Sequence, residues 1–364
     1  MIIGILGGGQ LARMMALEGY PLGLEFIVLE PGPEACAAPV AEQIRAAYDD
    51  EAALTELAHR ADVITYEFEN VPAASVKFLT EHSNEVAVYP PPQALAMAQD
   101  RLNEKTLFRE LNIDTPAFAA VDSLAELTLA MKTIGWPAVI KTRTQGYDGK
   151  GQAVLREAAD LAPAWAQLKG VPAIVEAFVP FDREISVIAV RNREGQIVCY
   201  PITENSHKEG MLRLSIAQEN DPAQPLAVKY ATALLEKLDY VGVLALELFQ
   251  VGDQLLANEF APRVHNSGHW TQNGAKCSQF ENHIRAVAGL PLGQTHAQGH
   301  AAMVNLIGGL PASEAVLSHT HAHLHLYGKS PRPGRKVGHI NLQTQDQQAF
   351  DSELKSLISL AENC

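Results

Sequence analysis

We predict a mixed α/β and α+β fold, because the pattern of the chain changes near residue 90. Before that point, short apolar runs alternate with helical segments, which is typical of a doubly wound parallel sheet. After it, strands follow one another as hairpins, and three prolines at 90–92 separate the two regions. The 364 residues, 47% of them hydrophobic, suffice for two to three domains with packed cores.

The elements follow in order from these patterns. In the first region we expect strands at 2–6, 25–30, 61–68 and 85–90, with helices at 10–20 and 72–82. Asp100 is placed to cap a helix over 100–111 that opens the second region. There we expect strands at 173–179, 184–191 and 196–203, a helix at 225–238 and a hairpin at 244–260. The last segment, with strands at 301–308 and 323–328 and a terminal helix, is too short for a full domain and should pack on the second region.

Composition excludes several classes of protein. The formal net charge of −14 argues against nucleic acid as a partner, because a polyanion would be repelled. The cysteines have neither zinc spacing nor a C-x-x-C pair, so we expect reduced thiols; they are Cys36, Cys199, Cys277 and Cys364. The N-terminus does not resemble a signal peptide, and no apolar stretch reaches membrane-spanning length. We therefore expect a soluble, cytoplasmic protein.

A glycine-rich loop separates two short strands at 142–155. Gly146, Gly149 and Gly151 surround an aspartate and a lysine, and Lys141 ends the strand before them. The P-loop pattern fails here, and the dinucleotide fingerprint fails because a strand follows the loop. Two readings stay open, a hairpin that closes over a polyphosphate and a plain surface turn. A lysine at the end of the strand can reach phosphate oxygens, which favours the first.

The N-terminal turn carries a weak dinucleotide signal. Gly7, Gly9 and Ala12 follow a strand and open a helix, and Glu30 ends the next strand. This spacing suits an NAD(P)-dependent oxidoreductase, in which the carboxylate holds a ribose. The same turn also occurs where it only packs a helix on a strand or holds another phosphate.

The hairpin at 244–260 predicts a metal site. Each strand carries one carboxylate among apolar residues, Glu247 and Glu259. A three-residue loop, with Val251 opposite Leu255, would place these two carboxylates opposite each other; a two-residue loop would pair Glu247 with Asn258 instead. Facing carboxylates repel each other unless a cation lies between them, and oxygen ligands of this kind suit Mg²⁺. A polar sheet face in the other register is the alternative.

Two more clusters could carry chemistry. A loop at 261–271 gathers polar side chains with little secondary-structure signal: Arg263, His265, Asn266, Ser267, His269 and Trp270. A stiff loop near the end collects positive charges suited to an anionic small substrate: Lys329, Arg332, Arg335 and Lys336. His321, His323 and His325 alternate along a predicted strand, but no fourth zinc ligand is evident, so we interpret them as a structural or exposed face.

In this order, the motifs resemble the ATP-grasp superfamily. They are GGGQLARM, YEFENV, QDR, KTRTQGYDGKGQ, EAFVPFDREISV, NEFAPRVHNSGHWT and RPGRKVGH, and they span nearly the whole chain. Within the superfamily, they look like the enzymes that carboxylate a ribonucleotide in purine biosynthesis. The resemblance implies transfer of a carboxyl group from bicarbonate to the exocyclic amine of 5-aminoimidazole ribonucleotide. ATP would activate bicarbonate as carboxyphosphate, giving ADP and phosphate, with Mg²⁺ or Mn²⁺ as cofactor. The amine would then attack either carboxyphosphate or carbon dioxide released from it.

The resemblance also implies roles for individual residues. The ATP-binding positions would be Arg101, Lys141, Gly146, Tyr147, Asp148, Gly149, Lys150, Gly151, Gln152, Glu176, Ala177, Phe178, Val179, Glu184, His207, Asn258 and Glu259. The ribonucleotide-binding positions would be Gln10, Glu67, Asn70, Tyr147, Asn266, Ser267, Lys329 and Arg335. The catalytic positions would be Arg263, His265 and Lys329, and the metal ligands Glu247 and Glu259. Either Glu67 or His265 would handle the proton.

The resemblance divides the chain into four parts. These are an N-terminal Rossmann-like domain at 1–99, a small ATP-grasp subdomain at 100–170, a large subdomain with the metal site at 171–300, and a small C-terminal segment at 301–364. A homodimer and handover of the product to a separate mutase are expected. Three alternatives stay open: an ATP-grasp ligase acting on another acid such as formate, an NAD(P)-dependent oxidoreductase, and a nucleotide-binding regulatory module without turnover.

Overall fold

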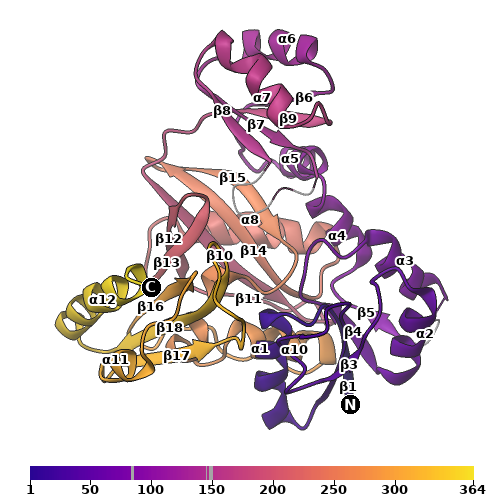
Figure 1. Cartoon of the computed structure of the whole chain (residues 1–364), viewed down its shortest axis with the longest axis vertical. Coiled ribbons are helices and arrows are strands. Elements are labelled where there is room, and N and C mark those ends of the chain that lie inside the picture. The colour runs from indigo at the N-terminus through magenta and orange to yellow at the C-terminus, as the bar shows by residue number, and fades with distance from the viewer. Residues whose placement is uncertain (83–85, 145, 147–150) are drawn as a thin grey trace.

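The N-terminal part of the computed structural model is a parallel sheet with helices on both faces (Figure 1). The structure describes residues 1–82, 86–144, 146 and 151–364. The strand order is β3–β2–β1–β4–β5, with bounds β1 (Ile2–Leu6), β2 (Glu25–Leu29), β3 (Glu42–Ile44), β4 (Val63–Tyr66) and β5 (Ala87–Val88). β1 and β4 are almost entirely buried, as expected for strands covered on both faces.

The two faces of this sheet have different neighbours. On one face lie α2 (Glu51–Arg60) and α3 (Ala73–His82), which enclose a core within the N-terminal part. On the other, α1 (Gln10–Gly19), which leads into the 3₁₀ turn η1 (Tyr20–Leu22), packs against α10 (Gln279–Ala288) from the middle of the chain. The apolar core on that face is therefore shared between the two parts, which holds them together.

A small antiparallel sheet forms the separate lobe at the top of Figure 1. Its order is β6–β9–β7–β8, with bounds β6 (Phe118–Val121), β7 (Ala138–Thr142), β8 (Gln152–Leu155) and β9 (Ala173–Ala177). It is covered by α6 (Leu124–Ile134), α7 (Leu161–Gln167) and the turn η2 (Ala158–Asp160). This lobe has a core of its own, and α4 (Pro92–Ala98) and α5 (Arg101–Glu110) precede it in the chain.

The largest sheet is antiparallel and continues into the C-terminal segment (Figure 1). Its order is β15–β14–β10–β12–β13–β16–β18–β17, with β11 paired to β10. The bounds are β10 (Arg183–Arg191), β11 (Ile197–Cys199), β12 (Ile202–Lys208), β13 (Met211–Gln218), β14 (Gly242–Val251), β15 (Gln254–Ala261), β16 (His300–Ile307), β17 (Ala322–Leu326) and β18 (Lys336–Thr344). The remaining helices are α8 (Gln224–Lys237), α9 (Thr271–Gly274), α11 (Ser313–Leu317), α12 (Gln347–Glu362) and the turn η3 (Asn266–Gly268).

The predicted combination of α/β and α+β parts is confirmed, and Asp100 caps α5 by accepting from Leu102 N at 2.9 Å. The expected continuous strand at 196–203 is wrong: Pro201 has no N–H to donate, and the chain divides there into β11 and β12. The C-terminal strands extend the largest sheet itself, so this segment shares its backbone hydrogen bonds. No helix in the described part of the chain combines the length and apolar character needed to cross a membrane.

Candidate active site

The β14–β15 hairpin places Glu247 opposite Glu259, as predicted, but by another route. The loop has two residues, with Val251 paired to Gln254, so the expected three-residue loop is wrong. A β-bulge between Glu247 and Leu248 corrects the register, because Asn258 is the extra residue on β15. The bulge therefore returns both carboxylates to one pair, which the length of the loop alone would have separated.

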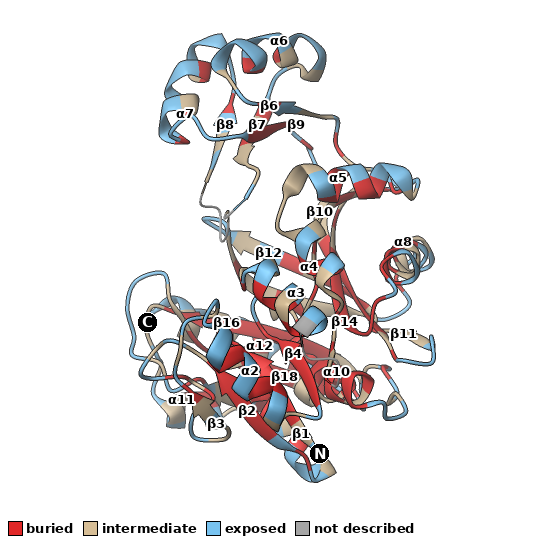
Figure 2. Cartoon of the chain, turned by 90° about the vertical axis from the view of Figure 1, so that its right-hand side faces the viewer, coloured by how far each residue is buried: buried red, intermediate tan, exposed pale blue. Residues whose placement is uncertain are grey.

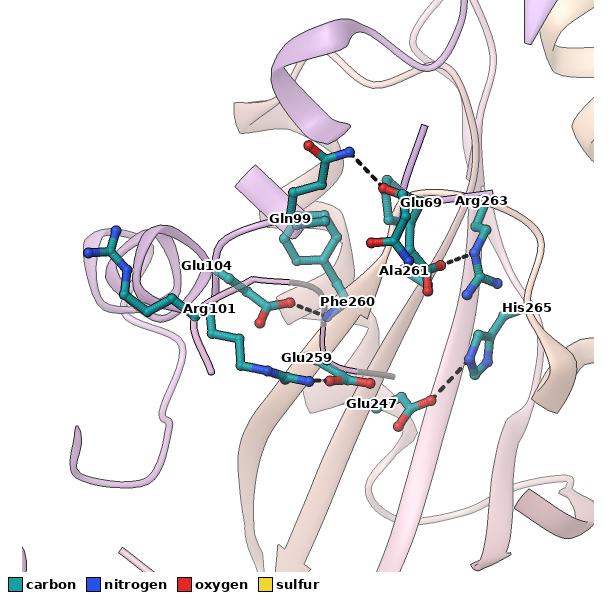
Figure 3. A pocket seen from close by; sticks show the side chains of 15 residues that line it. Glu69, Gln99, Arg101, Glu104, Glu247, Glu259, Phe260, Ala261, Arg263 and His265 are labelled. Atoms are coloured by element: carbon teal, nitrogen blue, oxygen red, sulfur yellow. Dashed lines mark hydrogen bonds and ion pairs between the residues drawn. The ribbon is translucent and has the colours of Figure 1, made fainter. Parts of the chain in front are cut away.

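The two carboxylates have opposite electrostatic environments (Figure 3). Burial and the neighbouring charge of Glu259 raise the pKa of Glu247 to about 7. Burial would also raise the pKa of Glu259, but Arg101 outweighs it: Arg101 Nη1 lies 2.8 Å from Glu259 Oε2, and the pKa of Glu259 falls to about 2. Glu259 is thus ionised and paired, whereas Glu247 gains most from an added cation.

Helix α5 holds the free edge of β15. Phe260 N donates to Glu104 Oε1 at 2.6 Å, and Lys105 Nζ donates to Ala257 O at 3.0 Å. Ala257 N donates to Asp114 O at 2.7 Å, just beyond the helix. These contacts replace a neighbouring strand, so the backbone on both sides of Glu259 is held from α5 as well as from β14.

A buried charge cluster connects α5 with the small lobe. Glu176 Oε2 lies 3.4 Å from Lys105 Nζ and 3.2 Å from Lys141 Nζ, and the Lys105 side chain is 0% exposed. Burial would raise the pKa of Glu176, but the two ammonium groups lower it, and burial lowers the pKa of Lys105. The Glu176 carboxylate therefore anchors Lys141, whose own position borders the cavity.

Arg263 and His265 lie beside the carboxylate pair (Figure 3). The Arg263 guanidinium pairs with Glu69 and also donates to Val264 O at 2.9 Å. His265 Nε2 lies 3.1 Å from Glu247 Oε1. Burial, and then the charge of Arg263, lower the pKa of His265 well below its ordinary value, so its ring is neutral.

One cavity of about 1010 Å³ joins most of the predicted residues. From the ATP set, the cavity is lined by Arg101, Lys141, Gly146, Gln152, Glu184, His207, Asn258 and Glu259. From the other sets, it is lined by Gln10, Glu67, Asn70, Glu247, Arg263, His265, Asn266, Lys329 and Arg335. His207 Nδ1 lies 2.7 Å from Glu184 Oε2; burial would lower the pKa of His207, but Glu184 raises it.

Some candidates do not border this cavity. Ser267 is 0% exposed, and its hydroxyl lies behind His265, so direct contact with the ribonucleotide is not supported. Gly151 and the residues at 176–179 are also absent from the lining in the described part of the chain. The roles predicted for Tyr147, Asp148, Gly149 and Lys150 concern positions outside the described residues.

The glycine turn at the start of α1 is occupied by protein groups. Glu67 accepts hydrogen bonds from Gly9 N at 2.5 Å and Ala12 N at 2.9 Å, which are amides that a dinucleotide phosphate would use. Glu30 accepts from Gly8 N at 3.0 Å, and Tyr48 Oη donates to it at 2.6 Å. The dinucleotide interpretation of this turn is therefore not supported. Burial raises the pKa of Glu67, whose carboxylate borders the cavity.

The basic loop, which carries Lys329, Arg332, Arg335 and Lys336, contacts the glycine turn beside the cavity. Lys329 Nζ contacts Gln10 Oε1, which brings residues from the two ends of the chain together. Arg335 Nη1 donates to Ser330 O at 3.1 Å, which orders its own loop. Burial lowers the pKa of Lys329. Both side chains border the cavity, as expected for groups that bind an anion.

His321 and His325 have structural partners, whereas His323 is exposed. His321 Nδ1 lies 2.7 Å from Glu353 Oε1, and His325 Nε2 lies 2.8 Å from Asn273 Oδ1. The His325 ring also stacks on His339 at 4.4 Å between centroids. Their places in the structure agree with the interpretation as a structural or exposed face.

Sequence reasoning missed several residues around the cavity. Phe181 and Phe249 stack at 4.9 Å and line it, and Glu104 borders a smaller cavity of about 70 Å³ with both carboxylates. Glu104 and Lys105 had a detectable signal, because they are charged residues on the face of α5 that buries Phe108. An amphipathic helix normally has apolar residues at such positions.

The donors suit a divalent cation. No group of three or more His, Cys, Asp or Glu side chains that could hold a metal occurs among the residues that the structure describes. Mg²⁺ does not need such a group, since it commonly takes one or two carboxylates together with substrate phosphates. Glu247 and Glu259, opposed on β14 and β15 beside the Asn258 amide, match that requirement.

Comparison with protein families divides the chain into three matches. Residues 106–280 match the ATP-grasp domain, and residues 1–99 match the ribonucleotide synthetase preATP-grasp domain. Residues 301–353 match the phosphoribosylaminoimidazole carboxylase C-terminal domain. These matches agree with the order of the motifs in the sequence.

Similar proteins cover the whole chain. The N5-carboxyaminoimidazole ribonucleotide synthase of Pseudomonas aeruginosa is 52% identical over 362 residues, 100% of both chains. The crystal structure of the corresponding synthetase from Thermus thermophilus has a TM-score of 0.94 and 52% identity, covering 99% of this chain and 98% of that one. An Aspergillus clavatus synthase in complex with ADP and 5-aminoimidazole ribonucleotide has a TM-score of 0.92 and 29% identity, covering 100% and 99%. The chain belongs to the N5-carboxyaminoimidazole ribonucleotide synthase family of ATP-grasp ligases.

Proposed function

We propose that this chain uses ATP and bicarbonate to carboxylate the exocyclic amine of 5-aminoimidazole ribonucleotide. The observation that carries the proposal is a single cavity lined by three chemically distinct groups of residues. One group is Lys141 and Glu184, another is Lys329 and Arg335, and the third is the Glu247–Glu259 pair with Arg263 and His265. This arrangement suits the transfer of a group activated at a nucleotide to a second anionic substrate.

The ATP end would be held by positive charge and an aromatic surface. Lys141 is anchored by Glu176, so its ammonium can bind phosphate oxygens without a large loss of side-chain entropy. Glu247 and Glu259, with the Asn258 oxygen beside them, would hold Mg²⁺ or Mn²⁺ with the phosphates. The chemistry supplied by such a cation is neutralisation of phosphate charge during transfer. Phe249 offers an apolar face for the base.

Bicarbonate would attack the γ-phosphate to form carboxyphosphate, and the amine would then attack its carbon. Arg263 presents a planar guanidinium to the planar anion, and its pairing with Glu69 fixes the orientation of that group. The amine nitrogen forms the new C–N bond as the phosphate leaves with the C–O electron pair. Lys329 and Arg335 would bind the phosphate of the ribonucleotide, and Gln10 would support Lys329.

A formate-dependent ligase of the same superfamily is the nearest alternative. ADP release should be fastest with both 5-aminoimidazole ribonucleotide and bicarbonate, and leaving out either one should reduce it. Formate should not replace bicarbonate. Full ADP release with formate, or none with bicarbonate, would contradict the proposal, as would a nicotinamide absorbance change without ATP consumption.

A matched pair of variants tests the metal assignment. Glu247→Gln should lower turnover by about two orders of magnitude, because charge stabilisation by a metal supplies several kcal/mol. Glu236→Gln, an exposed change on α8, should leave turnover unchanged. We also propose a cytoplasmic homodimer that passes its product to a separate mutase, on the basis of the family resemblance.

A further inference from the structure

We propose that His265 acts as a hydrogen-bond donor through Nε2 and not as a base, because buried groups behind the ring occupy Nδ1. The catalytic meaning of this inference rests on the proposed function. The state of the ring rests only on the geometry of η3 and the sheet beneath it. Three other residues, Ser267, Ser186 and Asn205, become positioning residues for the reaction.

The local backbone determines which ring nitrogen carries the proton. His265 caps η3, and Ser267 N donates to His265 Nδ1 at 3.3 Å. A backbone N–H can only donate, so Nδ1 must present its lone pair. In a neutral imidazole, the single proton is then on Nε2.

A buried series of side-chain hydrogen bonds favours the same tautomer of His265, with its proton on Nε2. Asn205 Nδ2 donates to Ser186 Oγ at 3.0 Å, and Ser186 Oγ donates to Ser267 Oγ at 2.8 Å. Ser267 Oγ lies 2.9 Å from His265 Nδ1, and because it already accepts from Ser186, its own proton is free for that nitrogen. Ser215 Oγ donates to Asn205 Oδ1 at 2.8 Å, which orients the amide. Every donor in this hydrogen-bond series therefore points toward the His265 ring.

The His265 imidazole cannot flip without breaking other contacts. Gln279 is 0% exposed, and its amide accepts from His265 N at 2.9 Å and donates to His265 O at 2.6 Å. The backbone of His265 is thus held on both sides, while the ring is held at Nδ1. The Nε2 atom is left beside the cavity, 3.1 Å from Glu247 Oε1.

This arrangement gives different roles to His265 and Glu67, the two groups that could accept the released proton. With Nδ1 occupied and Nε2 protonated, the neutral ring has no lone pair for the proton that the amine releases. It can instead donate to an oxygen of bicarbonate or carboxyphosphate, where negative charge develops. Glu67 accepts one backbone N–H on each oxygen, from Gly9 and Ala12, so each oxygen keeps a second lone pair. The released proton would go to Glu67.

Nitrogen NMR of the full-length protein, labelled with ¹⁵N-histidine and free of substrates, tests the state of the ring. His265 should show a protonated Nε2 and an unprotonated Nδ1, identified by the signals lost in His265→Gln. Ser267→Ala should shift the Nδ1 signal, because one of its two donors is removed. Ser75→Ala, at another buried serine that lines neither cavity, should leave it unchanged. A protonated Nδ1, or an Nδ1 signal unaffected by Ser267→Ala, would overturn the proposal even if the proposed reaction were correct.

A pair of substitutions tests the catalytic meaning. His265→Gln keeps an N–H donor near the position of Nε2 but cannot act as an imidazole base, whereas His265→Leu removes both. We expect His265→Gln to retain at least about 10-fold more turnover than His265→Leu, the value of one hydrogen bond to a charged group. Equal loss in two variants that still bind ATP would overturn the donor role.

Discussion

Replacing Glu104 by glutamine should stabilise the ligand-free protein, and the gain should grow as the pH rises. Glu104 is 1% exposed, and its Oε1 accepts from Phe260 N at 2.6 Å. Burial, and then the charge of Glu259, raise the pKa of Glu104 from 4.5 to about 8. Glutamine keeps the size and the accepting oxygen of this side chain but carries no charge.

The direction of the pH dependence follows from the number of protons bound in the folded and unfolded states. The unfolded chain releases the Glu104 proton near pH 4.5, whereas the folded protein keeps it until about pH 8. Between these values the folded state binds more protons, so wild-type stability falls as the pH rises, and the loss is complete above the folded pKa. One pKa unit corresponds to about 1.4 kcal/mol. Because Lys105 and Arg101 respond as Glu104 ionises, we expect a total of roughly 2–5 kcal/mol.

Urea unfolding in EDTA without nucleotide measures this difference. The free energies of unfolding of Glu104→Gln and wild type should agree within about 1 kcal/mol near pH 5, and the variant should be more stable near pH 8.5. Glu110→Gln, an exposed change on the same helix, should follow wild type at both values. A variant that is less stable than wild type near pH 8.5, or a difference independent of pH, would refute the reasoning.

Four further substitutions test the rest of the site. Glu176→Gln should lower the free energy of unfolding by about 3–5 kcal/mol, because it leaves Lys105 buried without a carboxylate. Lys105→Met should cost less, since Glu176 keeps Lys141 at 3.2 Å; the reverse order in urea unfolding would contradict this. Arg335→Ala should raise the KM for the ribonucleotide and spare that for ATP, and a similar rise in both would remove its assignment to the substrate. Glu259→Gln should reduce turnover by at least about 100-fold. Loss of the partly exposed ion pair with Arg101 should lower the free energy of unfolding of this variant by about 1 kcal/mol. A higher free energy of unfolding would show that repulsion between Glu259 and Glu247 dominates.

Much of the site could be predicted because its residues occur in short local patterns. The glycine turn, the carboxylates of the β14–β15 hairpin and the basic loop each have a composition that already indicates their chemistry. The structure brings these segments to one cavity. There Lys329 contacts Gln10, although the two residues lie near opposite ends of the sequence. No local pattern contains that contact, because it depends on how the C-terminal strands extend the largest sheet.

Burial separated residues that look alike in the sequence. Asn266 and Ser267 are adjacent polar residues, but only Asn266 borders the cavity, while Ser267 lies behind His265. The sequence places Glu104 and Lys105 as charges on the apolar face of α5, but only the structure shows that they bind the edge of β15. Figure 2 shows the parallel sheet and the centre of the largest sheet as the most continuously buried regions, and these were the regions that apolar periodicity predicted.

By itself, the sequence determined the class of the fold, the order of its parts and the types of residue available for chemistry. These follow from apolar periodicity, turn residues and motif spacing, which act over a few neighbouring positions. Only the tertiary structure decided how the facing carboxylates meet, through a bulge at Asn258 that corrects a two-residue loop. It alone also decided which charges are paired and which are buried without a full partner, as for Glu259 with Arg101 and for Glu247. The physical reason is that register, burial and charge pairing depend on segments far apart in the chain, and each of them changes the free energy of an otherwise identical side chain.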